Sequence, residues 1–321
     1  MEKVLIKTKQ SFKFSLKKRF LNSRYLILMI IPAIVFYAIF NYVPMYGVLL
    51  SFSRYSPRLG LIGSIFQNWI GFENFDVIFH YEGFWTAFRN TVMIGTTKVI
   101  ISFVSAITVA LLINELRLKY FKKIVQIIVT FPHFLSWVIV AALFILLFSE
   151  SGSINHMIAQ AGGQKINLFT DGKMFLGLIF SSDIWKEAGW SSIIYIATMA
   201  GISPDLYEAA DIDGASRLQK IWHITLPGVK PTAIFLLIMS VGGVLGAGFD
   251  QIFNMTSALR NGLVIDSVQI LETLIYQMNI ATSTMTVGQG TAMGLFKSVV
   301  GFILVIFTDR IAKAFGERGI I

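Results

Sequence analysis

One apolar stretch of the chain contains four side chains that could do chemistry, namely Asp183, Lys186, Glu187 and Trp190. They fall at positions i, i+3, i+4 and i+7, so on a helix they would form a single stripe. Charged groups inside an apolar segment are costly unless they face water or one another. The stripe could hydrogen-bond hydroxyl groups and stack on the apolar face of a sugar ring. Alternatively, it contains an ion pair that only holds helices together.

Further polar side chains interrupt the other apolar stretches. Lys98 lies about a third of the way along its stretch, where it either pairs with a neighbour or extends to the lipid headgroups. Ser136 and Trp137 follow a proline that predicts a kink. His133 beside that proline is better explained as a hydrogen-bonded structural residue than as a metal ligand, because the other histidines lie on other segments. A last group, which either caps a helix at the outer surface or faces a substrate path, comprises Asp250, Gln251 and Asn254.

These residues do not form a recognisable catalytic set. An intramembrane enzyme, the remote alternative, would need a converging catalytic pair or a metal set, and the sequence has no H-E-x-x-H, no G-x-S-x-G and no aspartate pair at working spacing. It also has no G-x-x-x-x-G-K-[ST] phosphate loop and no cysteine. We therefore expect no catalytic residue, no metal site and no cofactor bound by this chain.

The elements that carry these residues are expected to be membrane helices. Hydrophobic residues make up 55% of the chain and charged residues only 14%, far from the composition of a soluble domain. Crossing a bilayer takes about 20 apolar residues. We predict an all-α polytopic membrane protein with six transmembrane helices, over residues 25–51, 87–113, 124–149, 174–200, 231–256 and 287–311.

The distribution of basic residues predicts the orientation. Both terminal segments and the connections after spans two and four together carry 18 Lys and Arg, against 5 in the three remaining connections. By the positive-inside rule both termini are cytoplasmic. The net charge of +9 is then a topology signal, and we expect no nucleic-acid binding. We expect a basic segment over 1–24 that contacts membrane lipid or is a solvated tail, a transmembrane domain over 25–311, and a cytoplasmic tail over 312–321.

A polar segment, residues 203–231, separates predicted spans four and five and falls on the cytoplasmic side. Ser203 can cap a helix that has Pro204 at its first position. Gly214 can end that helix or permit a close backbone approach. Ser216 can cap a second helix, which we expect Pro227 to end. Two short helices joined at a glycine would form a compact knob that fits a groove on another protein; the alternative is an ordinary polar linker.

The residues of this segment resemble the cytoplasmic coupling loop of permeases from binding-protein-dependent ATP-binding-cassette importers. The family's pattern, E-A-A-x-x-D-G-A-x5-F-x-x-I-x-L-P, is matched at nine of its ten specified positions. Ile221 stands where the pattern has Phe, and the adjacent Trp222 could supply the aromatic bulk. The resemblance implies contact with an ATPase at Glu208, Ala209, Ala210, Asp213, Gly214, Ala215, Ile221, Trp222, Leu226 and Pro227, with Glu208 and Gly214 central.

Three other runs, residues 41–47, 131–137 and 248–254, resemble one subgroup of carbohydrate-importer permeases, which serves complex oligosaccharides and uses a lipoprotein receptor. The resemblance implies half of the translocation pathway of an oligosaccharide importer in a prokaryotic cytoplasmic membrane. It also implies a second, related permease as heterodimer partner, two ATPase subunits that bind ATP, and an extracytoplasmic sugar-binding protein. Intramembrane lysines would suit uronic-acid oligosaccharides. An importer permease for peptides, amino acids or other solutes shares the coupling loop and remains the alternative.

Overall fold

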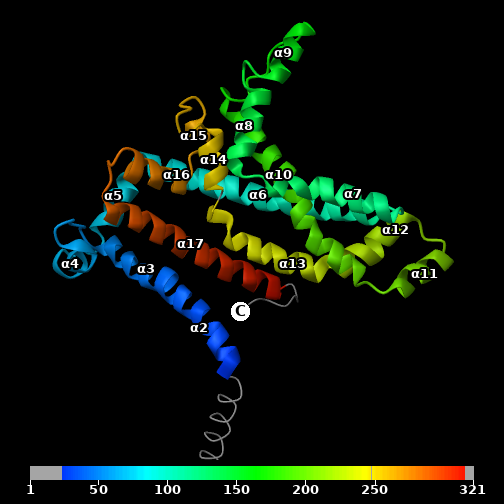
Figure 1. Ribbon diagram of the computed structural model, residues 1–321, viewed down its shortest axis with the longest axis horizontal. Helices are drawn as coiled ribbons and strands as arrows, with labels where there is room; N and C mark the ends of the chain where they lie inside the picture. The colour runs from blue at the N-terminus through cyan, green and yellow to red at the C-terminus, as the bar shows by residue number, and fades with distance from the viewer. Residues whose placement is uncertain (1–23, 247, 315–321) are drawn as a thin grey trace, which may run out of the picture. The chain divides into compact units, whose positions relative to one another are not determined.

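The computed structural model describes residues 24–246 and 248–314 (Figure 1). Within these ranges every regular element is helical, apart from a single β-bridge between Ser53 and Trp69. The predicted all-α class is therefore confirmed. The basic segment before Arg24 and most of the predicted tail lie outside the described residues. The chain divides into two compact units, one ending at Asn74 and the other beginning at Phe75.

The first unit is an apolar helix followed by a short hydrogen-bonded turn. Its elements are α2 (Arg24–Tyr37), the π-helical turn η1 (Ala38–Tyr42), α3 (Val43–Met45), the 3-10 helix η2 (Tyr46–Phe52) and α4 (Gly60–Gln67). Pro44 lies in the first turn of α3, where a missing N–H is tolerated because the π-helical turn precedes it. The buried amide of Asn74 donates to the carbonyls of Ser51 (3.0 Å) and Ser53 (3.1 Å), which closes the end of this helix.

The second unit contains the long helices that carry the candidate site. In chain order its elements are α5 (Glu73–His80, which begins in the first unit), α6 (Glu82–Asn114), α7 (Lys119–Thr130), η3 (Phe131–Phe134), α8 (Trp137–Phe148), α9 (Ser153–Gln160), α10 (Gly172–Ala200), α11 (Pro204–Ile212), α12 (Arg217–Lys220), η4 (Ile221–Thr225), α13 (Leu226–Gly242), η5 (Val244–Gly246), α14 (Phe249–Met255), α15 (Ile265–Val268), α16 (Leu271–Tyr276), η6 (Gln277–Ala281) and α17 (Val287–Ala314). α6 packs along α10, and α13 packs along α17 (Figure 1).

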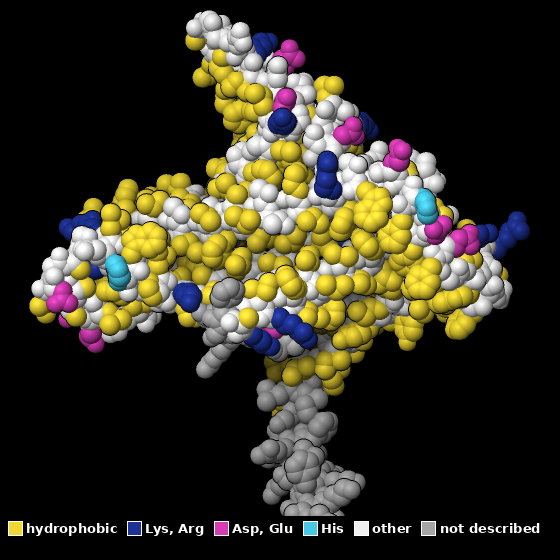
Figure 2. Space-filling model, turned by 180° about the vertical axis from the view of Figure 1, so that it is seen from behind, with side chains coloured by type: hydrophobic (Ala, Val, Ile, Leu, Met, Phe, Trp, Pro, Cys, Tyr) yellow, Lys and Arg dark blue, Asp and Glu magenta, His cyan; other side chains and the backbone are white. Residues whose placement is uncertain are grey.

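Five helices among the described residues are long and apolar enough to cross a membrane: Leu28–Phe52, Glu82–Asn114, Trp137–Gln160, Arg217–Gly242 and Val287–Ile311. The predicted fourth span, 174–200, lies within α10, a continuous helix of 29 residues, but the charged stripe lies in its middle. The count of six spans therefore stays a prediction. Figure 2 shows hydrophobic side chains over much of one face of the molecule, as expected for a surface that contacts lipid.

Two predicted spans are interrupted. In the third, α7 ends at Thr130 and α8 begins at Trp137, so the expected proline kink is a full break with η3 inside it. In the fifth, the helix ends at Gly242, and α14 begins after Gly248, whose φ of +90° lies in the left-handed region that favours glycine. The helix through the predicted range 231–256 thus begins earlier, at Arg217, and ends earlier, at Gly242; where it crosses the membrane stays a prediction.

The expectation that Pro227 ends the second helix of the polar segment is also wrong. The π-helical turn η4 changes the hydrogen-bond pattern just before it, so α13 starts at Leu226 and Pro227 stands in the first turn. Proline has no N–H to donate, and the change from π- to α-helical hydrogen bonding at this point accommodates it within the helix. As a result α12, η4 and α13 form one continuous helix from the polar segment into the apolar region.

Two glycines bring the long helices close together. A Cβ on Gly95 of α6 would overlap the carbonyl oxygen of Val244, and one on Gly189 of α10 would overlap that of Val129 at the end of α7. Both positions therefore require glycine on steric grounds. Buried apolar side chains fill the space between α6, α10 and α13, including Ala106, Tyr195 and Val229.

Candidate functional site

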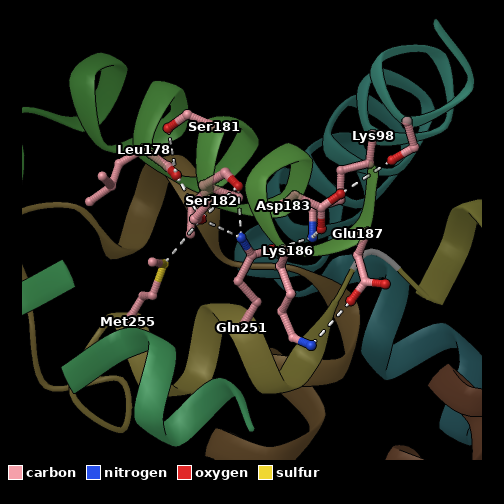
Figure 3. A network of polar contacts seen from close by, with 11 residues as sticks. Lys98, Leu178, Ser181, Ser182, Asp183, Lys186, Glu187, Gln251 and Met255 are labelled. Atoms are coloured by element: carbon pink, nitrogen blue, oxygen red, sulfur yellow. Dashed lines mark hydrogen bonds and ion pairs between the residues drawn. The ribbon is translucent and has the colours of Figure 1, made fainter. Parts of the chain in front are cut away.

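The charged stripe of α10 is present, and its buried members point to different neighbours (Figure 3). Asp183 forms an ion pair with Lys98 of α6. Lys98 Nζ lies 3.1 Å from Asp183 Oδ1, and the two side chains are only 12% (Lys98) and 11% (Asp183) exposed. Ser102, one turn after Lys98, donates to Asp183 Oδ2 at 3.3 Å. The expectation that Lys98 pairs with a neighbour is therefore confirmed, and extension to the headgroups is wrong.

Gln251 joins a third helix to this ion pair. The side chain is fully buried, and its Nε2 donates to the carbonyl of Ile179 (2.7 Å) and to Ser182 Oγ (2.9 Å) on α10. Its Oε1 accepts a hydrogen bond from Lys98 Nζ. Every polar atom of the amide is thus used to hold α14 against α6 and α10, as a buried amide requires. In this structure Gln251 is a link between helices.

Lys186 points toward the break between α7 and α8. Its Nζ donates to the carbonyl oxygen of His133 at 2.6 Å and lies 3.3 Å from Glu187 Oε1. It also lies 5.5 Å from the centre of the Trp137 ring, a cation–π arrangement. A helix break inside a membrane frees backbone carbonyls that must find a donor. Lys186, 6% exposed, is that donor.

His133 connects the same break to the exposed end of the stripe. Its Nδ1 lies 2.7 Å from Glu187 Oε2, and its ring stacks on Trp190 with 4.4 Å between centroids and 4° between planes. The interpretation of His133 as a hydrogen-bonded structural residue agrees with these contacts. Trp190 is 44% exposed. Its ring is therefore held in place by the stack on His133 while part of the side chain stays accessible.

A cavity of about 420 Å³ lies beside the ion pair, between α6, α10 and α13. This volume is within the usual range for small-molecule sites, about 300–1,000 Å³. Its apolar walls are interrupted by polar or aromatic side chains: Lys98, Ser102, Trp190, Ser191, Tyr195 and Ser240. The combination of hydroxyl groups, aromatic rings and one ammonium group can bind a ring that has hydroxyls on its edge and C–H groups on its face.

The polar segment folds as two helices joined at a glycine, as predicted. Gly214 has a φ of +71°, and the N–H of Ala215 donates back to the carbonyl of Ala210 at 2.9 Å, which ends α11. Ser216 caps α12 in a reciprocal arrangement with Gln219. Ser203 occupies the predicted cap position of α11, but its hydroxyl donates to Asp205 Oδ2 at 3.1 Å and accepts no backbone N–H.

Two contacts fasten these helices to each other. Tyr207 Oη on α11 lies 3.0 Å from Thr225 Oγ1 on η4, and Lys220 Nζ on α12 lies 2.5 Å from Asp211 Oδ1. Because η4 continues directly into α13, α11 is attached to the base of a helix whose residues Leu236 and Ser240 line the cavity.

The comparison with known families gives a clear result. Residues 99–318 match the model of the family described as "Binding-protein-dependent transport system inner membrane component". The chain belongs to this family. It is a multi-pass membrane protein and a transport component, so the predicted class of protein is confirmed and the intramembrane enzyme is not.

Individual relatives of this permease cover nearly its whole length. The polygalacturonan/rhamnogalacturonan transport system permease protein YteP of Bacillus subtilis (strain 168) is 41% identical over 317 residues, 96% of this chain and 95% of that protein. Protein LplB of the same organism is 38% identical over 300 residues, covering 93% and 92%. The resemblance to permeases of carbohydrate importers is therefore confirmed.

Two crystal structures of a bacterial alginate transporter contain a chain with the same fold. In the first, of an ABC transporter involved in the import of the acidic polysaccharide alginate, the match has a TM-score of 0.82 and 34% identity, covering 93% of this chain and 98% of that chain. In the second, which is in complex with an alginate pentasaccharide-bound periplasmic protein, the TM-score is 0.82 and the identity 33%, covering 94% and 99%.

The motif residues of the permease's polar segment lie mostly at the surface. Glu208, Asp213 and Gly214 are exposed, and Trp222, in the position suggested to replace the pattern's Phe, is 66% exposed. Ile212, which precedes Asp213, is 88% exposed. Large exposed apolar side chains in an otherwise polar loop mark a candidate interaction surface. Ala210, Ala215, Ile221 and Leu226 are half-buried, Ala209 and Pro227 exposed.

Not all of the remaining candidate site residues lie near the charged stripe of α10. Ser136 caps α8 by accepting from the N–H of Ile139 at 3.4 Å. Asp250 is exposed, and its carbonyl accepts from Asn254 Nδ2 at 2.7 Å, so these two residues contact each other on α14 and do not join the network of Lys98. Sequence reasoning missed Ser102, although its i+4 spacing from Lys98 places both on one helical face. It also missed Tyr207, for which no signal was available.

Proposed function

We propose that this chain is one permease half of an ATP-driven oligosaccharide importer, and that uronic-acid oligosaccharides are among its substrates. The observation that carries the proposal is the cavity between α6, α10 and α13, in which hydroxyl and aromatic side chains adjoin a buried, charged network. The relatives add weight, because YteP is named for polygalacturonan and rhamnogalacturonan and the related structures for alginate.

The proposed partners follow from two features of this chain, the missing ATP-binding motif and the exposed residues of the segment 203–231. The sequence has no ATP-binding motif, so ATP binds to two separate ATPase subunits, and this chain holds no cofactor. Their contact is the coupling loop, residues 203–231, on the cytoplasmic side, with Glu208, Gly214 and the exposed Trp222 at the interface. A second, related permease completes the pathway. An extracytoplasmic sugar-binding protein delivers the substrate, and a related structure includes such a protein.

The coupling loop reaches the cavity along two helices. α10 ends at Ala200, immediately before α11, and the continuous helix through α12, η4 and α13 leaves the other end of the loop. Both α10 and α13 contribute walls to the cavity. When ATP binding closes the ATPases, the loop moves and both walls move with it, so the ATPases favour one of two global states of the cavity, which is what coupling requires.

Uptake by a strain that lacks only this gene tests the proposal. We expect loss of uptake of oligogalacturonides with retained uptake of unrelated solutes, and restoration by the gene in trans. Loss of peptide or amino-acid uptake, with normal uptake of every oligosaccharide tried, neutral and acidic, would instead support an importer for those solutes.

A further inference from the structure

The described lining of the cavity between α6, α10 and α13 carries a net positive charge. Among the described residues that line it, Lys98 alone carries a formal charge. Asp183, which pairs with Lys98, is buried and is not part of the lining. Among the described lining residues, a ligand in the cavity therefore meets a positive group and no negative one.

The ammonium group of Lys98 has a hydrogen-bond donor to spare. A lysine has three N–H donors. Within the part of the chain that the structure describes, Asp183 Oδ1 accepts one and Gln251 Oε1 accepts another (Figure 3). Gly248 leaves room for the group, because a Cβ at that position would lie 2.5 Å from Lys98 Nζ. The ammonium is thus held in place from α10 and α14 while the third donor remains for a cavity ligand.

We propose that Lys98 is a specificity-determining residue that binds a carboxylate group of the transported oligosaccharide. The Lys98 ammonium is charged, so a uronate carboxylate adds an attraction between opposite charges that a sugar hydroxyl lacks, and is the better acceptor here. Trp190, which lines the same cavity, offers an aromatic face to the sugar ring. This inference rests on the proposed import of oligosaccharides and adds the residue that distinguishes acidic from neutral forms.

The competing role for Lys98 is purely structural, as the positive half of a buried ion pair. Removing one partner of such a pair is strongly destabilising, whereas replacing both is often neutral. The single variant Lys98→Gln is therefore accompanied by the double variant Lys98→Gln/Asp183→Asn, which removes both charges. Lys297→Gln is the matched control, because Lys297 also forms an ion pair inside a long helix, with Glu272, but does not line this cavity.

The experiment compares uptake of a tri-galacturonide and its methyl ester by cells that carry each variant in place of the natural gene. The two sugars have the same rings and glycosidic bonds, and the ester carries an uncharged methyl ester in place of each carboxylate. For the double variant we expect the ratio of acid to ester uptake at sub-saturating concentration to fall about 10-fold or more, as loss of a charged hydrogen bond predicts. Lys98→Gln should show the same fall, and Lys297→Gln should keep the natural ratio.

An unchanged ratio in the double variant, with both sugars still imported, would overturn the role of Lys98 and leave the proposed function intact. An equal loss of both sugars would also overturn it, because that is the behaviour of a structural ion pair. If cells with the natural gene import neither sugar through this system, the proposed substrate class is wrong and the inference falls with it.

Discussion

Tyr207 Oη lies 3.0 Å from Thr225 Oγ1, across 18 residues of the coupling loop. The bond joins α11 to η4, the π-helical turn that leads into α13. The ion pair of Asp211 with Lys220 adds a second tie. With both in place, we expect the two helices of the loop to move as one body and a displacement of α11 to reach the helix that lines the cavity.

Tyr207→Phe should weaken this connection without unfolding the chain. A neutral hydrogen bond contributes about 0.5–1.5 kcal/mol, so we expect substrate-stimulated ATP hydrolysis by the purified transporter to fall about 2- to 10-fold. Tyr120→Phe is the matched control, because Tyr120 is 80% exposed on α7. Equal stimulation in Tyr207→Phe and the natural protein would show that the loop does not depend on this bond.

Lys186→Gln should behave differently from Lys98→Gln. Lys186 donates to the carbonyl of His133 and is only 6% exposed, so it supports the break before α8, and it is not among the residues that line the cavity. We expect a lower melting temperature in detergent, from a loss of about 1–3 kcal/mol, and an equal reduction in uptake of acidic and neutral sugars. A selective loss of acidic sugars would assign substrate contact to Lys186 as well.

Gly189→Ala should destabilise the packing of α10 against α7. The added Cβ would overlap the carbonyl oxygen of Val129, which is backbone and cannot rotate away. We expect a cost of about 1–3 kcal/mol, seen as a lower melting temperature.

Gly177→Ala is the control for helix propensity in the same helix. A Cβ at Gly177 meets nothing within 4 Å, so alanine should stabilise α10 by about 0.5–1 kcal/mol. If the two variants melted at the same temperature, the close approach of α7 would have no energetic weight.

Local features of the loop could be predicted from sequence because they depend on neighbouring residues. The turn at Gly214 and the cap at Ser216 are of this kind. Pro227 was misjudged because a change from π- to α-helical bonding, which has no sequence signature, puts it in a first turn. The helix that begins at Arg217 therefore could not be bounded correctly.

The site required knowledge of packing. Helical periodicity put Asp183, Lys186 and Glu187 on one stripe, but it could not show that Asp183 meets Lys98 on α6 while Lys186 meets the broken backbone near His133. Those pairings depend on how α6, α7 and α10 approach one another. The aromatic stack of His133 on Trp190 likewise joins residues 57 positions apart in the chain.

The most direct test of the account uses Gly214→Asp in the reconstituted transporter. The side chain would enter open space from a position with a φ of +71°, and aspartate tolerates this conformation better than most residues. The substitution therefore alters the docking surface more than the fold. Gly162→Asp is the matched control, with a φ of +79° and equally open surroundings. Gly162 lies in a segment predicted to be on the opposite side of the membrane from the coupling loop.

The measurement is ATP hydrolysis in vesicles, with and without the sugar-loaded binding protein, at equal amounts of membrane-inserted permease. We predict that Gly214→Asp inserts normally but loses substrate stimulation of hydrolysis, while Gly162→Asp retains it. Normal stimulation in Gly214→Asp would contradict the claim that residues 203–231 couple this permease to its ATPases.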